Sequence, residues 1–240
     1  MFDQIYTLLS HNDIFTPETL IHYWHGFVTT VQLVFLCLAL GLAFSIPLAL
    51  MRASRNMWIS GPIWVYTYVF RGTPLLVQLY IIYYGSAQIP GIQHTFLWDF
   101  LRSPFYPALI AFTLNTVAYQ TEIIRGAIVA TPHGEIEAAR AYGMSWAKYT
   151  WRIVLPSALR RGLQAYSNEV IFMLHASAIA SAVTIIDLTG AAYDIYAKFY
   201  APFDAFLFVA AIYLIVSFSI IYGFKRLERR LLAHLRPAGS

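Results

Sequence analysis

Two glutamates, Glu122 and Glu169, each stand inside a long run of apolar residues. An ionised side chain in such a setting costs about 2.5–3.5 kcal/mol on membrane-insertion scales, so it normally has a partner or a function. Carboxylates form their strongest hydrogen bonds with cationic donors such as guanidinium and ammonium groups. The two glutamates therefore predict a site for a cationic side chain, and both are candidate solute contacts.

Further polar residues lie at helical spacing near the two glutamates. Asn115 and Tyr119 precede Glu122 on the same turn-by-turn stripe, which places the three side chains on one helix face. Asn168 and His175 make a similar stripe on the following apolar run. An interior histidine most often satisfies a structural hydrogen bond, so a structural role and a solute contact both stay open for His175.

The tetrapeptide Arg-Gly-Thr-Pro at residues 71–74 interrupts another apolar run and predicts a broken helix. A break frees backbone groups that can bind a solute, and an amino acid would need donors for its α-carboxylate. The candidate donors are Gln78, Asn115, Tyr119 and the backbone near Thr73. Arg71 is a further candidate if it does not simply mark a helix end. A solute with a cationic group is therefore predicted, and among amino acids arginine, ornithine, lysine and histidine can carry one.

The composition favours lipid as the solvent. Hydrophobic residues make up 59% of the 240 residues and charged residues only 12%, whereas a soluble domain carries about 25% charged residues. The net charge of +4 comes from residues at the ends of apolar runs, which is typical of membrane topology and not of a nucleic-acid-binding surface. Cys37 stands alone and supports no disulfide framework.

Five apolar runs are long enough to cross the hydrocarbon core, which needs about 20 residues. They are residues 27–51, 61–84, 105–124, 162–186 and 205–224. Basic residues concentrate in the loops that share a side with the C-terminus, so the N-terminus is predicted outside and the C-terminus inside. The sequence thus predicts an all-α membrane protein with a periplasmic or interfacial segment at 1–26, a transmembrane domain at 27–224 and a cytoplasmic tail at 225–240. No cleavable signal peptide is expected.

The largest cytoplasmic loop, residues 126–161, is too patterned for a simple connector. Thr131-Pro132 predicts the cap of a helix that runs from His133 to Tyr142, and Gly143 predicts a left-handed helix end. Ser145 predicts a second helix that stops before Pro156. Alanines at 138, 139 and 141 give the first helix a face of small residues. Two interpretations stay open: the helix docks in a partner's groove, or it folds back on its own bundle.

The same loop resembles the EAA motif of ABC importer permeases, E-A-A-x3-G-x9-I-x-L-P. Glu137-Ala138-Ala139, Gly143 and Ile153-Val154-Leu155-Pro156 meet every fixed position. Residues 70–74 with Gln78, Asn115 with Tyr119 and Glu122, and Arg125-Gly126 are similar to the polar amino-acid uptake subfamily. Residues 132–143 and 165–171 resemble the M-type membrane subunits of histidine/lysine–arginine–ornithine importers. The resemblance covers about residues 22–236.

The resemblance implies a type I ABC importer permease of the bacterial inner membrane, without catalysis, cofactor or metal of its own. It implies pairing with a homologous but different membrane subunit, two copies of a soluble ATPase, a periplasmic binding protein and a basic amino acid as cargo. Glu137, Ala138, Ala139 and Gly143 carry over as ATPase-coupling residues. Glu122 is common across the subfamily, which leaves a structural role open through pairing with Arg125 or Arg71. Glu169 is more typical of basic amino-acid importers.

Two other functions are weighed against a transport subunit. An intramembrane enzyme would use Glu122, Glu169 and His175 as acid–base groups, but the sequence lacks the zinc-protease and nucleophile signatures that would support it. A passive or ion-coupled carrier would relay protons through a glutamate, but it would leave the loop at 126–161 without a purpose. The sequence contains no Walker A segment, so an ATP-driven mechanism requires the ATPase to be another chain.

Overall fold

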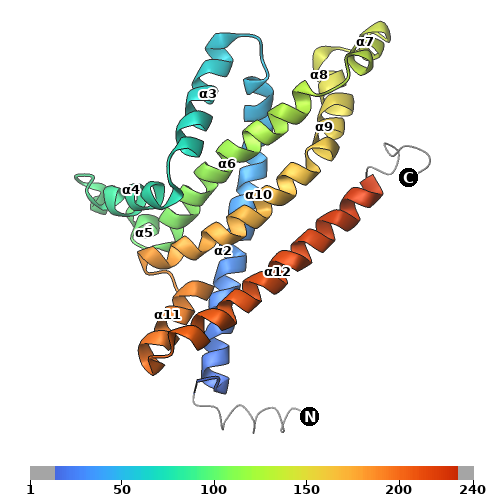
Figure 1. The fold of residues 1–240 in the computed structure, drawn as a ribbon. Coiled ribbons are helices and arrows are strands. Elements are labelled where there is room, and N and C mark those ends of the chain that lie inside the picture. Colours follow the sequence, from blue (N-terminus) through green and yellow to red (C-terminus); the bar gives the residue numbers. More distant parts are fainter. Residues whose placement is uncertain (1–13, 232–240) are drawn as a thin grey trace. The chain divides into compact units, whose positions relative to one another are not determined.

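A computed structural model describes residues 14–231. Every regular element in that range is helical (Figure 1). The elements are α2 (Pro17–Arg52), α3 (Met57–Gly72), α4 (Leu75–Ala87), the 3-10 helix η1 (Ile92–His94), α5 (Trp98–Leu101), α6 (Phe105–Val129), α7 (His133–Ala141), α8 (Trp146–Tyr149), the π-helix η2 (Thr150–Val154), α9 (Leu155–Arg161), α10 (Leu163–Ala176), the 3-10 helix η3 (Ser177–Val183), α11 (Leu188–Phe199) and α12 (Pro202–Leu231). The all-helical expectation is confirmed.

The described chain forms two compact units. The first unit holds residues 14–37, 75–112 and 172–218, and the second unit holds residues 38–74, 113–171 and 219–231. Four long helices, α2, α6, α10 and α12, contribute residues to both units. Segments distant in the sequence therefore build each unit, and the polar residues singled out above are divided between them.

The first unit is organised around the start of α2. The helix begins at Pro17, and the backbone N–H of Thr19 donates to Thr16 Oγ1 over 3.4 Å. Tyr23 lies in an apolar core with α11 and α12. A Cβ at Gly26 would stand 2.6 Å from the backbone oxygen of Asp187. Only glycine permits so close an approach, and this brings α2 against the start of α11.

The second unit packs the end of α2 against α6 and α9. Its core includes Ala49, Ile124 and Leu155. Gly41 makes the closest approach, because a Cβ there would lie 2.8 Å from Thr116 Cγ2 and 2.9 Å from Gln120 Nε2. This approach places the polar side chains of α6 directly beside the α2 backbone.

Two of the described helices, Pro17–Arg52 and Pro202–Leu231, are long and apolar enough to cross a membrane. The bent pair Leu163–Val183 and Leu188–Phe199, with an angle of 49°, raises that number to three at most. The run at 61–84 is divided between α3 and α4 at Thr73-Pro74, which confirms the predicted break. The expectation of five spans stays a prediction, because length and composition support only the smaller number in residues 14–231. The separate helix α11 was not foreseen.

One prediction for the loop at 126–161 is confirmed and one is wrong. Thr131-Pro132 stands directly before α7, with Pro132 at the cap position, and Thr131 Oγ1 accepts a hydrogen bond from Arg161 Nη2 at 2.7 Å. The predicted stop before Pro156 is wrong, because the helix from Trp146 continues through Pro156 into α9. The π-turn before this proline explains the continuity: Leu155 N–H reaches back to Thr150 O, and the wider turn relieves the clash that proline causes in an α-helix.

Candidate functional site

The C-terminal end of α3 is the first feature of the candidate site in the second unit. Pro74 cannot continue the helix, and Thr73 adopts an extended conformation with φ −113° and ψ 146°. The last carbonyl groups of a helix lack partners within the helix. Here the hydroxyl of Thr73 donates to Val69 O at 2.8 Å. Asn115 Nδ2 donates to Phe70 O at 3.1 Å and the Tyr119 hydroxyl to Arg71 O at 3.4 Å.

These contacts assign a structural task to three predicted solute donors. Thr73, Asn115 and Tyr119 hold the end of the broken helix, and Asn115 and Tyr119 reach it from one face of α6 as predicted. Arg71 lies beside them with its guanidinium carbon 5.1 Å from the centre of the Tyr119 ring, and its side chain is exposed. The break therefore presents a cation held over an aromatic ring.

Glu122 is the centre of an ion-pair cluster, which we call the Glu122 cluster. Its carboxylate accepts from Arg125 Nε at 2.6 Å, from Arg52 Nε at 3.1 Å and from the Thr67 hydroxyl at 3.0 Å. The Glu122 side chain is 12% exposed, and those of Arg52 and Arg125 are 20% and 32% exposed. The cluster joins α2, α3 and α6. Its Arg125 partner was foreseen, while Arg52 and Thr67 were not.

Glu169 has a different environment. It is 5% exposed, and its Oε1 accepts from the Thr116 hydroxyl at 2.7 Å. Gln120 Nε2 donates to Thr116 Oγ1 at 3.1 Å, and the Ser45 hydroxyl donates to Gln120 Oε1 at 3.4 Å. A polar chain thus runs from α2 through α6 to the Glu169 carboxylate.

Thr116 and Gln120 were not among the predicted site residues. Both are fully buried, and they lie four residues apart on α6, next to the stripe of Asn115 and Tyr119. Their i, i+4 spacing was a usable signal for a second polar face. A single helix of polar and small residues does not reveal which neighbour that face will meet.

The other predicted contacts have different surroundings. Gln78 is buried in α4 and belongs to the first unit. His175, also in the first unit, lies 2.9 Å from Ser217 Oγ through its Nε2 and makes an edge contact with the Tyr213 ring. Asn168 belongs to the second unit but lines a cavity beside α12. Asn168 and Glu169 therefore occupy different faces of α10.

The loop at 126–161 carries the predicted coupling residues on α7 and its end. Gly143 has φ +69°, and its N–H donates to Arg140 O at 2.9 Å, which confirms the left-handed helix end. Glu137 and Ala138 are exposed, but Ala139 is buried against Tyr149 and Val154 of the same chain. The small-residue face is therefore split between the chain's own core and the surface.

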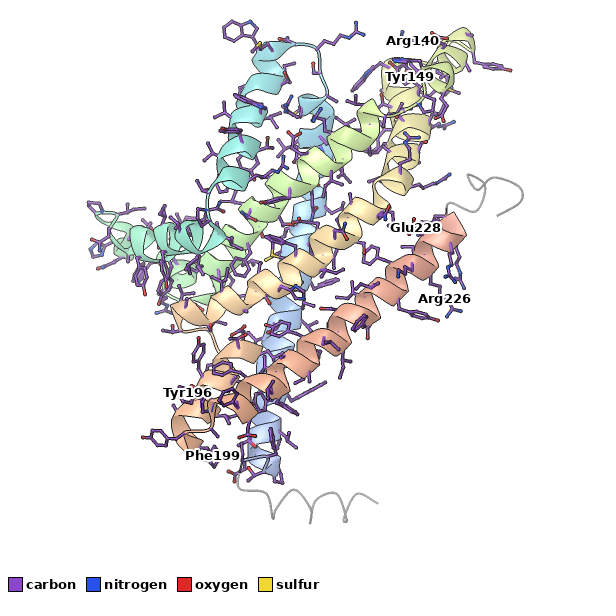
Figure 2. The ribbon with its side chains drawn as sticks, in the orientation of Figure 1. Arg140, Tyr149, Tyr196, Phe199, Arg226 and Glu228 are labelled. Carbon is purple, nitrogen blue, oxygen red and sulfur yellow. The ribbon has the colours of Figure 1, made fainter. Side chains whose placement is uncertain are left out.

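Arg140 and Tyr149 hold α7 against α8. Figure 2 shows the two side chains together, with Arg140 Nη2 3.4 Å from the Tyr149 hydroxyl and the guanidinium 5.7 Å from the ring centre. A cavity of about 390 Å³ opens beside them, lined also by Arg55 and Trp146. Contacts within the chain thus hold α7 in place, and a cavity lined by Arg55 and Arg140 lies next to it.

Metal ligation has no support within residues 14–231, where no group of three His, Cys, Asp or Glu side chains could hold an ion. The arrangement offers instead a buried carboxylate, an exposed guanidinium and an exposed helix, α7. These features suit solute binding and contact with a partner protein.

Comparisons with known proteins agree with this chemistry. Residues 41–233 match the family described as binding-protein-dependent transport system inner membrane component. The chain is 49% identical to the histidine/lysine/arginine/ornithine transport system permease protein HisM of Escherichia coli K12, over 90% of this chain and 91% of that protein. It is 44% identical to the octopine transport system permease protein OccM of Rhizobium radiobacter, over 89% and 87%.

Solved structures show the same fold. An amino acid ABC transporter crystallised with histidines aligns with a TM-score of 0.76 and 34% identity, over 89% of this chain and 95% of that one. The MetNI methionine transporter aligns with the same TM-score of 0.76 at 18% identity, and that match concerns the fold alone. Together with the sequence match, they show that the chain belongs to the family of inner membrane permeases of binding-protein-dependent ABC transport systems, in which the ATPase is a separate subunit.

Proposed function

We propose that the chain is the permease subunit of an ATP-driven importer for basic amino acids, with arginine, ornithine, lysine and histidine as the solute class. The observation that carries the solute class is the buried carboxylate of Glu169, whose hydrogen bond comes from the neutral Thr116 hydroxyl. The name of the Escherichia coli relative, which specifies histidine, lysine, arginine and ornithine, supports the same class.

Glu169 is the better of the two glutamates for a cationic solute. An unneutralised carboxylate within an apolar helix is costly, and a guanidinium or ammonium group of the solute offsets that cost by ion pairing. Glu122 already has two guanidinium partners. We therefore assign Glu122 a structural role and Glu169 the contact with the solute side chain.

Arg71 is the proposed partner for the α-carboxylate. Its exposed guanidinium can donate two parallel hydrogen bonds to a carboxylate. Thr73, Asn115 and Tyr119 hold the helix end that carries Arg71, so they act on the solute by positioning it. Gln78, Asn168 and His175 remain proposed solute contacts, reached at other stages of transport.

The proposed assembly is a type I importer. The chain crosses the inner membrane five times, with residues 1–26 periplasmic or interfacial, 27–224 forming the transmembrane domain and 225–240 forming the cytoplasmic tail. It pairs with a homologous second permease, and a periplasmic binding protein delivers the solute. Two ATPase copies contact the helix bearing Glu137, Ala138 and Ala139, and Gly143 fixes where that helix ends. The exposure of Glu137 and Ala138 supports this contact.

Reconstituted uptake tests the proposal. Proteoliposomes holding the complete complex should accumulate radiolabelled arginine only when ATP, the ATPase and the binding protein are all present. Unlabelled ornithine, lysine or histidine should compete, and glutamate should not. Arginine uptake that continues without the ATPase would instead support a passive or ion-coupled carrier and overturn the proposal.

A further inference from the structure

A second cavity, with a mixed polar and apolar lining, lies in the second unit between α10 and the C-terminal part of α12. Its volume is about 210 Å³. Pockets for drug-sized ligands measure about 300–1,000 Å³, so this cavity suits a smaller molecule. The lining residues are Leu163, Gln164, Ser167, Asn168, Ile171, Ile221, Phe224, Lys225 and Glu228.

Two opposite charges of α12 line this cavity without neutralising each other. Lys225 and Glu228 are three residues apart, so they lie on one helix face. Among the ion pairs of residues 14–231, none includes either side chain. Figure 2 shows Glu228 and Arg226 leaving α12 on different sides, as a two-residue separation requires. Arg226 does not line the cavity.

The neutral part of the lining complements these charges. From α10, Gln164, Ser167 and Asn168 present amide and hydroxyl groups that both donate and accept. From α12, Ile221 and Phe224 present apolar surface. A ligand with an ammonium group, a carboxylate and a partly apolar stem would satisfy all three parts.

We propose that this cavity binds a free α-amino acid as its zwitterion, with the α-carboxylate on Lys225 and the α-ammonium group on Glu228. Charge-assisted hydrogen bonds to both groups explain why a lysine and a glutamate stand side by side without an ion pair. The ligand recognised is the shared backbone of amino acids, so the site is distinct from the side-chain contact at Glu169.

The position of the cavity indicates when it fills. The orientation proposed above, on which this step rests, puts the C-terminal part of α12 at the cytoplasmic surface. The cavity is then loaded by solute that has accumulated inside the cell. An amino acid bound there bridges α10 and α12, and α10 also carries Glu169. Occupancy restrains the helix that holds the transported solute and so slows further import.

Binding to the assembled complex in nanodiscs tests the site, with the binding protein left out. The Glu169→Gln background removes the proposed transport site from the measurement. Titration calorimetry should detect arginine, and Lys225→Gln or Glu228→Gln should each weaken its binding about tenfold or more, equivalent to about 1.4 kcal/mol. Arg226→Gln, which removes a charge from the other side of the same helix, should leave arginine binding unchanged.

Three ligands separate the two contacts. Agmatine lacks the α-carboxylate and Nα-acetylarginine lacks the α-ammonium charge, so both should bind more weakly than arginine. Lys225→Gln should abolish the difference between arginine and agmatine, and Glu228→Gln the difference between arginine and Nα-acetylarginine. The double exchange Lys225→Glu with Glu228→Lys keeps both charges and should bind arginine better than either single variant.

Equal arginine binding by Lys225→Gln, Glu228→Gln and Arg226→Gln would overturn the site, as would undetectable arginine binding by the complex. Phosphatidylcholine and phosphatidylethanolamine are both zwitterionic, but only phosphatidylethanolamine has a primary ammonium group. Arginine binding seen in phosphatidylcholine nanodiscs but lost in phosphatidylethanolamine nanodiscs would show that the phosphatidylethanolamine headgroup occupies the cavity, which also overturns the amino-acid site. Norvaline, a neutral zwitterion, should bind with the same dependence on Lys225 and Glu228. That result supports the cavity even if arginine uptake fails and the proposed cargo is wrong.

Discussion

Replacing Glu122 by glutamine should destabilise the fold without changing what the protein transports. The carboxylate joins α2, α3 and α6 through two guanidinium groups and the Thr67 hydroxyl. Glutamine keeps the size of the side chain but removes its charge, so Arg52 and Arg125 would be left facing each other across a neutral amide.

The magnitude follows from the burial of the Glu122 cluster. Breaking a fully buried ion pair costs about 3–5 kcal/mol, whereas an exposed pair contributes about 0–1 kcal/mol. The three charged side chains are 12%, 20% and 32% exposed, which places the cluster between these limits. We expect a loss of about 2–3 kcal/mol, which lowers the melting temperature by ~4–12 °C for a chain of this length.

Thermal unfolding of the purified complex, followed by loss of its size-exclusion peak after heating, measures this effect. The matched control is Asp204→Asn, because Asp204 is exposed, forms no ion pair among residues 14–231 and lies outside both proposed binding sites. The double variant Glu122→Gln with Arg125→Gln should recover part of the loss, since it removes one stranded cation. A melting temperature equal to the control, together with a selective loss of arginine transport, would refute the structural role and place Glu122 in the solute site.

Three further predictions concern other positions. Glu169→Gln should reduce arginine-stimulated ATP hydrolysis by the reconstituted complex more than basal hydrolysis, because the amide no longer pairs with the solute; an equal fall in both rates would show a structural role. Gly143→Ala should cost about 1 kcal/mol of stability at the helix end, because φ is +69° there, and it should lower ATP-coupled transport. If the variant still co-purifies with the ATPase and transports at the normal rate, this turn has no coupling role. Gly26→Ala should cost about 1–3 kcal/mol of stability, because its Cβ would stand 2.6 Å from Asp187 O. The melting temperature of the complex measures this loss, and an unchanged melting temperature would mean that α11 can shift away from α2 without cost.

Local rules predicted the features that depend on a few neighbouring residues. The break at Thr73-Pro74 and the left-handed Gly143 each follow from the conformations that proline and glycine allow. The same rules failed at Pro156. There the preceding π-turn changes which backbone carbonyl lies against the proline ring, so the helix can continue. Whether a π-turn or an α-turn forms depends on the tertiary packing of Val154 and Leu155.

The two glutamates show more clearly which features the local sequence cannot predict. Both are single acids in apolar runs, so the local sequence treats them alike. Their difference comes from residues far away in the chain: Glu122 meets Arg52, seventy positions earlier, while Glu169 meets Thr116, fifty-three positions earlier. No periodicity within either helix encodes which of these partners it will face, because that depends on the close approach at Gly41 and the packing of three helices.

The same reasoning links transport and the proposed cytoplasmic site through α10. Successive residues of a helix are about 100° apart, so Asn168 faces the cavity beside α12 while Glu169 faces Thr116 of α6. A movement of α10 that separates Glu169 from Thr116 must also change the cavity that Asn168 lines. A ligand bound in the cavity therefore opposes the separation of Glu169 from Thr116. Because Glu169 is buried, α10 cannot easily move on one face without moving on the other. Occupancy of one face of α10 is on these grounds coupled to the state of the other, without any longer pathway between them.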